Sequence, residues 1–238
     1  MVIDEVEMQD MAVRLEEEDV WASLGSRDRI VPSLVDEVAR GMDLSRTLCK
    51  PRGLYVRMAV GEVGRKQVSF GDGPLLEGSF VSHCFQGATE AVFTVVTIGP
   101  QLEQRVAEMF AQGDSVEAVV LDAVGSALVF NTFTKVAERI FEETTDRGWQ
   151  TGFCLRPGES YWDITGQREI FKAVQADKIG IDLLESCFMV PQKSQSAAFA
   201  LGSNLRVNSD PDQSYCRYCK AARCPMRQEE FVPSAILE

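Results

Sequence analysis

The chain has 238 residues, of which 45% are apolar, and a formal net charge of −12. This length and composition fit one large globular domain, or one domain with a small appendage, that buries a substantial core. The acidic charge and the lack of a basic run exclude a nucleic-acid-binding surface, because contacts to phosphates need clustered Lys and Arg.

The first part of the sequence alternates between helix and strand patterns. Ile30–Arg40 has apolar residues at helical spacing, and the β-branched and aromatic residues of Leu54–Val60 indicate a strand. Gly61–Gly64 predicts a turn into a partner strand over Lys66–Phe70. A short helix is expected over Phe80–Phe85.

The middle of the sequence predicts a buried strand followed by two helices. Ala91–Ile98 is a β-branched run typical of a central strand, and Gln101–Gln112 returns as a helix. Asp114 and Glu117 have the spacing of a capping box, which predicts that the longest helix begins there and runs to about Glu143.

Inside this longest helix, apolar residues recur near one stripe, and a small residue interrupts it. The stripe consists of Val116, Val120, Val124, Leu128, Phe133, Val136 and Ile140. Because a glycine inside a helix costs about 1 kcal/mol relative to alanine, Gly125 predicts a close approach of a neighbouring element.

The turn that follows Leu155 carries the most distinctive chemistry. Pro157 and Gly158 form a turn pair, and Arg156 beside them offers a planar donor fork suited to a carboxylate or phosphate. Tyr161 and Trp162 each offer a flat face with a polar handle. The residues alone leave two interpretations open: a connector in which Trp162 closes the core, or a ligand loop.

The C-terminal segment carries cysteines at metal-ligand spacing. Cys216, Cys219 and Cys224 read C-x2-C-x4-C-P, and the basic residues between them favour thiolates. Three cysteines are one short of the usual four ligands, and the spacing does not decide between zinc and an iron–sulfur cluster. The alternative is a set of reduced surface thiols. The fourth ligand could be Cys187, Cys154, His83 or a non-protein group.

Two spaced motifs resemble one family. The pattern P-G-x3-W-x4-Q-x3-F spans Pro157–Phe171, and I-G-x2-L-x2-S-x2-M-x-P-x-K-S-x-S spans Ile179–Ser196. Both resemble the activation (reactivation) domain of cobalamin-dependent methionine synthase, and more closely its stand-alone relatives. The resemblance extends upstream to Thr97–Glu103 and Asp122–Ala127, so it covers most of the chain.

The elements and the resemblance together predict an α+β fold with a twisted, mainly antiparallel sheet packed against helices. Residues 1–202 are expected to form the activation-domain-like unit. Residues 203–238 are expected to form a polar linker and the small cysteine-bearing tail.

The resemblance also implies a function, the reductive reactivation of a corrinoid-dependent methyltransferase. S-adenosylmethionine would be presented to cob(II)alamin, which a cobalamin-binding methyltransferase subunit supplies, and an electron donor such as flavodoxin or ferredoxin would complete the reaction. Arg156 would bind the methionyl carboxylate, Gly158 would admit the ligand to the backbone, and Glu159 would face the sulfonium. Tyr161 and Trp162 would flank the adenine or the corrin.

Departures from the family pattern keep alternative functions open. Arg156 directly precedes Pro157, Glu159 takes the place of a tyrosine, and an acidic residue of the long helix is replaced near Phe130 and Asn131. The alternatives are an iron–sulfur electron-transfer or corrinoid-protein-binding partner that does not bind S-adenosylmethionine, or a zinc-stapled interaction module. The need for an electron slightly favours a cluster over zinc on the tail.

The sequence also predicts the compartment. The start of the chain is acidic where a signal peptide would be basic, and we see no apolar run close to the roughly 20 residues that cross a bilayer. Seven cysteines in such a chain indicate thiols or metal ligands rather than disulfides. We therefore expect a cytoplasmic protein without membrane contacts. His83, the one histidine of the chain, is expected to be structural or solvent-facing.

Overall fold

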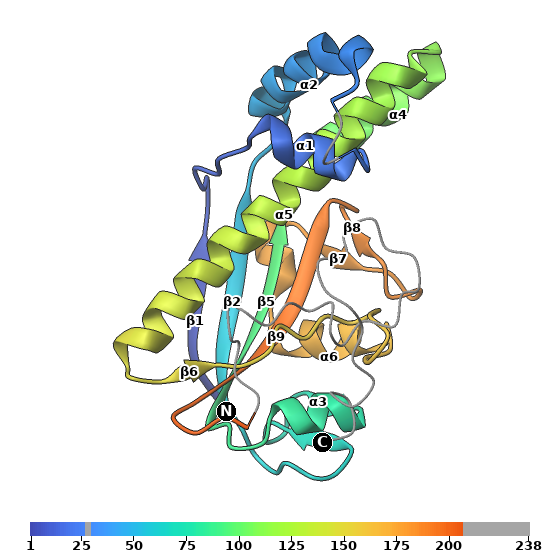
Figure 1. Ribbon diagram of the computed structural model, residues 1–238. Coiled ribbons are helices and arrows are strands. Elements are labelled where there is room, and N and C mark those ends of the chain that lie inside the picture. The colour runs from blue at the N-terminus through green and yellow to red at the C-terminus, as the bar shows by residue number, and fades with distance from the viewer. Residues whose placement is uncertain (27–29, 207–238) are drawn as a thin grey trace.

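The computed structural model describes residues 1–26 and 30–206. Its centre is a five-stranded sheet with the order β1–β2–β5–β9–β6, in which every neighbouring pair is antiparallel (Figure 1). The predicted class, an α+β fold with a mainly antiparallel sheet, is confirmed. The strands are β1 (Val2–Met8), β2 (Arg52–Ala59), β5 (Glu90–Thr97), β9 (Ser194–Gly202) and β6 (Gln150–Thr151).

The central strand β5 is buried along its whole length. It is hydrogen-bonded to β2 on one side and to β9 on the other, and both of its faces are covered. A strand covered on both faces reads as a continuous apolar run rather than an alternating one, which is the pattern of residues 91–98. The predicted buried central strand is therefore confirmed.

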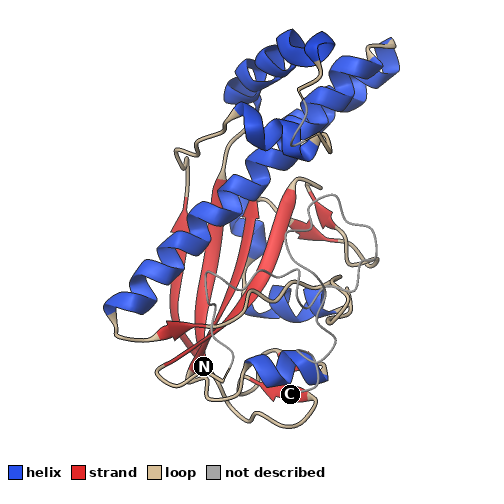
Figure 2. Cartoon of the chain, in the orientation of Figure 1, coloured by secondary structure: helices blue, strands red, loops and turns tan. Residues whose placement is uncertain are grey.

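One face of the sheet is covered by α5 (Ser115–Asp146), with α4 (Gln101–Gln112) beside its N-terminal half (Figure 2). A Cβ atom on Gly53 of β2 would lie 2.6 Å from Val136 Cγ2, so α5 approaches the sheet closely at this glycine. At Gly125 a Cβ atom would lie 2.6 Å from Leu102 Cδ2 of α4. The expected close approach at Gly125 is thus confirmed, and its reason is packing.

The opposite face of the sheet is covered by short elements around an aromatic cluster. The Phe70 ring makes edge contacts with the rings of Phe85 and Phe93, at centroid distances of 5.7 Å and 5.0 Å. The elements on this side are β3 (Gln67–Ser69), β4 (Leu75–Glu77), α3 (Ser79–Cys84), α6 (Gly166–Ala173), η2 (Ala176–Ile179), β7 (Asp182–Leu183) and β8 (Met189–Val190).

A separate apolar cluster lies where helices gather at the N-terminal end of α5. Here α1 (Glu17–Ser23), η1 (Pro32–Leu34) and α2 (Val35–Leu48) pack on α5, with Val20, Val38 and Val124 in the centre (Figure 1). Asn131 of α5 holds the start of α1 and the segment before it in place. Its Nδ2 donates to the carbonyl oxygen of Arg14 at 3.0 Å and to Asp19 Oδ2 at 2.8 Å.

Three expectations about local structure are wrong. The strand predicted over Lys66–Phe70 does not pair with β2, because β1 and β5 occupy both edges of β2; it forms β3 and pairs with β4. Asp114 makes no side-chain capping hydrogen bond, although α5 begins at the next residue. Val116 lies in the first turn of α5 and is 54% exposed, so it is not part of the buried stripe.

The long helix also bears on the expectation about membranes. By length and composition, α5 could span a bilayer, which the sequence pattern had not indicated. Most of its apolar window is buried inside the protein, as in the core helix of a soluble domain. The helix therefore does not indicate a membrane protein.

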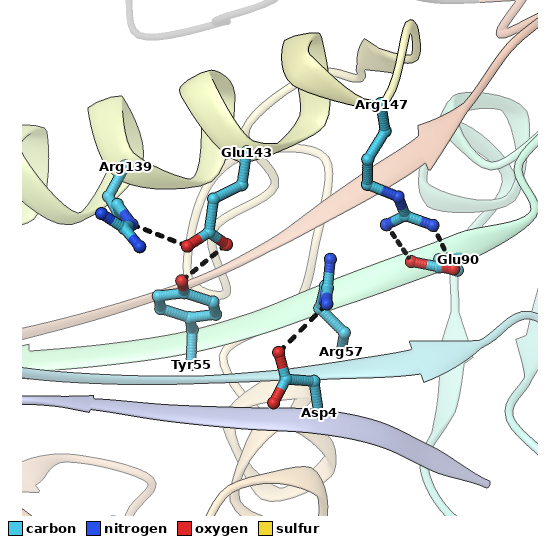
Figure 3. Close-up of polar contacts among 7 residues, drawn as sticks. All are labelled: Asp4, Tyr55, Arg57, Glu90, Arg139, Glu143 and Arg147. Atoms are coloured by element: carbon cyan, nitrogen blue, oxygen red, sulfur yellow. Dashed lines mark hydrogen bonds and ion pairs between the residues drawn. The ribbon is translucent and has the colours of Figure 1, made fainter.

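Polar contacts fasten the C-terminal half of α5 to the sheet (Figure 3). Glu143 of α5 accepts a hydrogen bond from the hydroxyl of Tyr55 at 2.8 Å and from Arg139 Nε at 2.6 Å. Burial, and then the bond to Glu143, raise the pKa of Tyr55 well above its ordinary value. This phenol therefore stays protonated and remains a donor.

The residue after α5 makes a second polar contact with the sheet. The Arg147 guanidinium donates two hydrogen bonds to the Glu90 carboxylate, at 2.7 Å and 2.6 Å (Figure 3). The same guanidinium lies 4.0 Å from the centroid of the Trp149 ring. A two-pronged bond with a stacked ring fixes both the distance and the plane of the pair.

Candidate functional site

The predicted ligand turn is anchored to the sheet at its start. Leu155 forms an isolated bridge with Ala198 of β9, and the two backbone hydrogen bonds measure 2.9 Å and 2.8 Å. The turn then closes on itself, because the amide of Gly158 donates to the carbonyl oxygen of Trp162 at 2.9 Å. Gly158 has φ +91°, in the left-handed region, and a Cβ atom there would also lie 3.0 Å from Ile164 Cδ1. The backbone thus requires glycine at this position.

Arg156 reaches from this turn toward α5. Its guanidinium carbon lies 4.4 Å from the centroid of the Phe133 ring, which is a cation–π contact. Its Nε is buried and has no hydrogen-bond partner among the described residues. The guanidinium opposes the rise that burial gives to the pKa of the neighbouring Cys154 thiol. Arg156 therefore has one donor, Nε, that no described residue uses.

The two aromatic residues of the turn point into the core. The Tyr161 ring lies 5.0 Å from the ring of Phe80 and 5.8 Å from that of Phe153. Its hydroxyl accepts a hydrogen bond from the amide of Arg156 at 3.2 Å, and burial raises the pKa of Tyr161 well above its ordinary value. Trp162 is 3% exposed and belongs to the core cluster on the α6 side.

The turn therefore separates the predicted site residues into two groups. Arg156, Gly158 and Glu159 are exposed or half-buried, whereas Trp162 is covered by protein and Tyr161 is packed between aromatic rings. The interpretation in which Trp162 closes the core describes its position in this structure. The roles of these residues toward a ligand stay predictions, and a contact with Trp162 would require the turn to rearrange.

The expected metal site cannot be located on the described part of the chain. Cys216, Cys219 and Cys224 lie outside the described residues, and within residues 1–26 and 30–206 no group of three or more His, Cys, Asp or Glu side chains could hold a metal ion. Of the suggested fourth ligands, Cys187 is buried and its sulfur accepts a hydrogen bond from Arg168 Nε at 3.2 Å. The thiol of Cys187 is thus already engaged.

The remaining cysteines and the histidine have positions that match ordinary packing. Burial raises the pKa of Cys49 to about 12 and that of Cys84 still further above its usual range, so both thiols stay protonated. His83 is half-buried, and burial followed by the nearby Arg206 lowers its pKa. These side chains are therefore neutral near pH 7.

Two hollows that the sequence did not reveal lie beside the segment 10–15, which joins β1 to α1. We call the first, with a volume of about 540 Å³, the α2 hollow. The second, with a volume of about 330 Å³, is the α5 hollow. The α2 hollow is lined by residues 10–15 together with Met42, Ser45, Arg46, Cys49, Lys50, Pro51 and Leu128. The α5 hollow is lined by Ala12, Val13, Arg14, Asn131, Thr134, Lys135 and Glu138.

Neither hollow coincides with the predicted ligand turn. Neither is lined by any residue from 156 to 162. The segment 10–15 gave no recognisable pattern, since its residues are neither periodic nor part of a motif. Only the basic residues near the end of α2, Arg46 and Lys50, could have signalled an unusual surface in an acidic chain.

Comparisons with known proteins identify the fold. No protein-family model matches the sequence, and the search of curated proteins gave no match. Among solved structures, the crystal structure of the MetH reactivation domain bound to AdoHcy is similar, with a TM-score of 0.63 over 90% of this chain and 80% of that one. The chain shares the fold of the MetH reactivation domain. The sequence identity is 15%, so the similarity to the MetH reactivation domain concerns the fold alone.

Proposed function

We propose that this protein acts in the cytoplasm as an accessory to a corrinoid-dependent methyltransferase of the methionine synthase type. It would bind S-adenosylmethionine and present the sulfonium methyl group to cobalamin held by a separate methyltransferase subunit. The observation that carries the proposal is the similarity to the MetH reactivation domain over 90% of the chain. That solved domain was bound to AdoHcy, which is the product of methyl transfer from S-adenosylmethionine.

The chemistry divides between the partner and this chain. The partner's cobalamin, once reduced by one electron from a flavodoxin- or ferredoxin-like donor, would supply the nucleophile. The methyl group would pass from the sulfonium to the cobalt, so that a cobalt–carbon bond would form as the carbon–sulfur bond breaks and S-adenosylhomocysteine is left. The task of this chain is to bind and orient the sulfonium compound, because holding reactants in line removes much of the entropic barrier.

Arg156 is the residue best suited to hold the methionyl carboxylate. It is half-buried, its position is fixed by Phe133, and its Nε lacks a partner among the described residues. A charge-assisted hydrogen bond to a carboxylate is stronger than one between neutral groups. Gly158 would let the ligand approach the backbone, and Glu159 would face the sulfonium, with Tyr161 supporting the turn from below.

Calorimetric titration tests the binding half of the proposal. S-adenosylmethionine and S-adenosylhomocysteine are expected to bind the wild-type protein, and Arg156→Gln should weaken both by about tenfold, as loss of one charge-assisted bond predicts. Arg105→Gln, on the exposed surface of α4, serves as the matched control and should bind as the wild type does. Absence of binding heat in the wild type at high ligand concentration would overturn this half.

A spectroscopic assay tests the reactivation half. The methyltransferase subunit carrying oxidised cobalamin is mixed with a reductant, S-adenosylmethionine and this protein. The methylcobalamin spectrum should appear only when all components are present. If it develops equally well without this protein, the accessory role is wrong even where the ligand binds.

The cysteine tail remains a separate prediction within this proposal. Cys216, Cys219 and Cys224 would hold an iron–sulfur cluster or zinc, and a cluster could deliver the electron. Anaerobic purification followed by metal and acid-labile sulfide analysis distinguishes the two. If the protein contains neither an iron–sulfur cluster nor zinc, the three cysteines of the tail are reduced thiols.

A further inference from the structure

The α2 hollow combines an apolar wall with a cationic rim. Met11, Leu15, Met42 and Leu128 line it with side chains that belong to, or pack against, the neighbouring core clusters. Its volume of about 540 Å³ lies within the range of small-molecule sites in proteins. Ligand sites in proteins combine apolar side chains with polar groups that orient the ligand. In this hollow the polar atoms form the larger part of the exposed lining.

The charges that line the α2 hollow have a sign opposite to that of the whole chain. Its charged lining residues are Arg14, Arg46, Lys50 and a single acid, Asp10, in a protein with a net charge of −12. Lys50 makes no ion pair with any residue that the structure describes. Its charge is therefore available to an anion.

The two arginines have partners that do not line the hollow. Arg14 pairs with Glu16, and Arg46 pairs with Asp43 at 2.8 Å, with most of each arginine side chain exposed. Exposed ion pairs of this kind contribute little free energy, so either guanidinium can turn to a ligand at small cost. The hollow thus has one unpaired cation and two that are readily recruited.

The neutral polar groups of the hollow do not oppose an anion. Ser45 is 4% exposed, and its hydroxyl donates to the carbonyl oxygen of Met42 at 2.7 Å. Cys49 stays a neutral thiol near pH 7, because burial raises its pKa to about 12. No buried carboxylate is among the lining residues, and the one acid, Asp10, is exposed.

We propose that the α2 hollow binds a small molecule with an apolar body and an anionic head group. The body would lie against the two methionines, and the head would lie at Lys50 and the neighbouring arginines. The cationic rim disfavours a sulfonium, so this site is separate from one for S-adenosylmethionine. The inference does not depend on the proposed function.

Methyl NMR of the full chain, labelled with carbon-13 at the methionine methyl groups, tests this site directly, with sodium octanoate as the probe. Met11 and Met42 line the hollow, whereas Met58, Met109 and Met189 do not and serve as internal references. Octanoate should shift the Met11 and Met42 signals saturably and leave the references unchanged. Uniform shifts, or none at Met11 and Met42, would overturn the proposal.

Charge reversal tests the anionic head group. Lys50→Glu should weaken octanoate binding by about tenfold, since it replaces an attractive charge with a repulsive one. The control Lys172→Glu reverses an exposed charge on α6, outside the hollow, and should bind octanoate as the wild type does. Equal affinity in the two variants, equal binding of 1-octanol, or competition by S-adenosylmethionine would each contradict the proposal.

Discussion

The carboxylate of Glu90 lies beneath the C-terminal half of α5, with its side chain 10% exposed, and is held there by the two-pronged bond to Arg147. Among the other ion pairs of the described residues, most join residues three or four positions apart on one helix, with at least one partner largely exposed. Loss of a buried ion pair costs more stability than loss of an exposed one, because the charge that remains is desolvated and unpaired.

Glu90→Gln should lower the free energy of unfolding by about 2–3 kcal/mol, because it leaves the partly buried Arg147 guanidinium without its anion. Urea denaturation followed by circular dichroism measures this. The matched control is Glu108→Gln, which breaks the exposed pair with Arg105 and should cost about 0.5 kcal/mol or less. Equal losses in the two variants would show that the buried pair has no special weight.

Single residues also show the limit of the sequence as a guide to the site. The pattern around Pro157 predicted a glycine-dependent turn, and the positive φ of Gly158 agrees with it. The same pattern could not tell which way the aromatic rings point, because a tyrosine or tryptophan fits either a core or a ligand. That choice is made by tertiary packing: Phe80, which is distant in sequence, contacts the Tyr161 ring together with Phe153, and α6 packs against Trp162.

At the scale of elements, α5 organises both the sheet and the helical end of the molecule. Its 32 residues contact the sheet along one half and α1, α2 and α4 along the other. Small residues set the distance at each contact: Gly53 under Val136, and Gly125 against Leu102. Enlarging either one forces apart two elements rather than two side chains.

Gly125→Leu is expected to destabilise the protein by about 2–3 kcal/mol. The new side chain would overlap Leu102, which is fully buried and cannot move aside into solvent. Thermal unfolding measures the change. Val119→Leu, on the exposed side of the same helix, is the control and should leave the midpoint nearly unchanged. An unchanged midpoint in Gly125→Leu would show that α4 and α5 separate freely.

Elements with strong local patterns were predicted well, and those defined by distant partners were not. Residues 101–112 and the long helix after Asp114 follow helical periodicity, and β5 follows a β-branched run. The pairing of β3 failed because strand partners depend on which edges are already occupied, and β1 from the N-terminus takes the edge of β2. The segment 10–15 carries no periodic signal, so the sequence could not predict the hollows beside it.

For the whole molecule, the order of the strands predicts the order in which backbone amides open. β5 is the central strand, bonded on both sides and buried throughout, whereas β1 is an outer strand with four of its seven residues exposed. Regions with few buried contacts open locally at a lower free energy than the core.

Hydrogen exchange of the β5 amides should therefore require global unfolding, and the β1 amides should exchange at least about tenfold faster. Exchange followed by mass spectrometry or NMR measures both strands in one experiment, with α5 amides near Val136 as a second core reference. Equal rates in β1 and β5 would show that the sheet opens only as one unit.

The shared wall of the two hollows has a thermodynamic consequence. Ala12, Val13 and Arg14 line both the α2 hollow and the α5 hollow. A ligand that displaces these three residues in one hollow therefore changes the shape of the other. Thermodynamic linkage makes this effect reciprocal. If a ligand in one hollow changes the binding free energy of a ligand in the other, the second ligand changes the binding free energy of the first by the same amount.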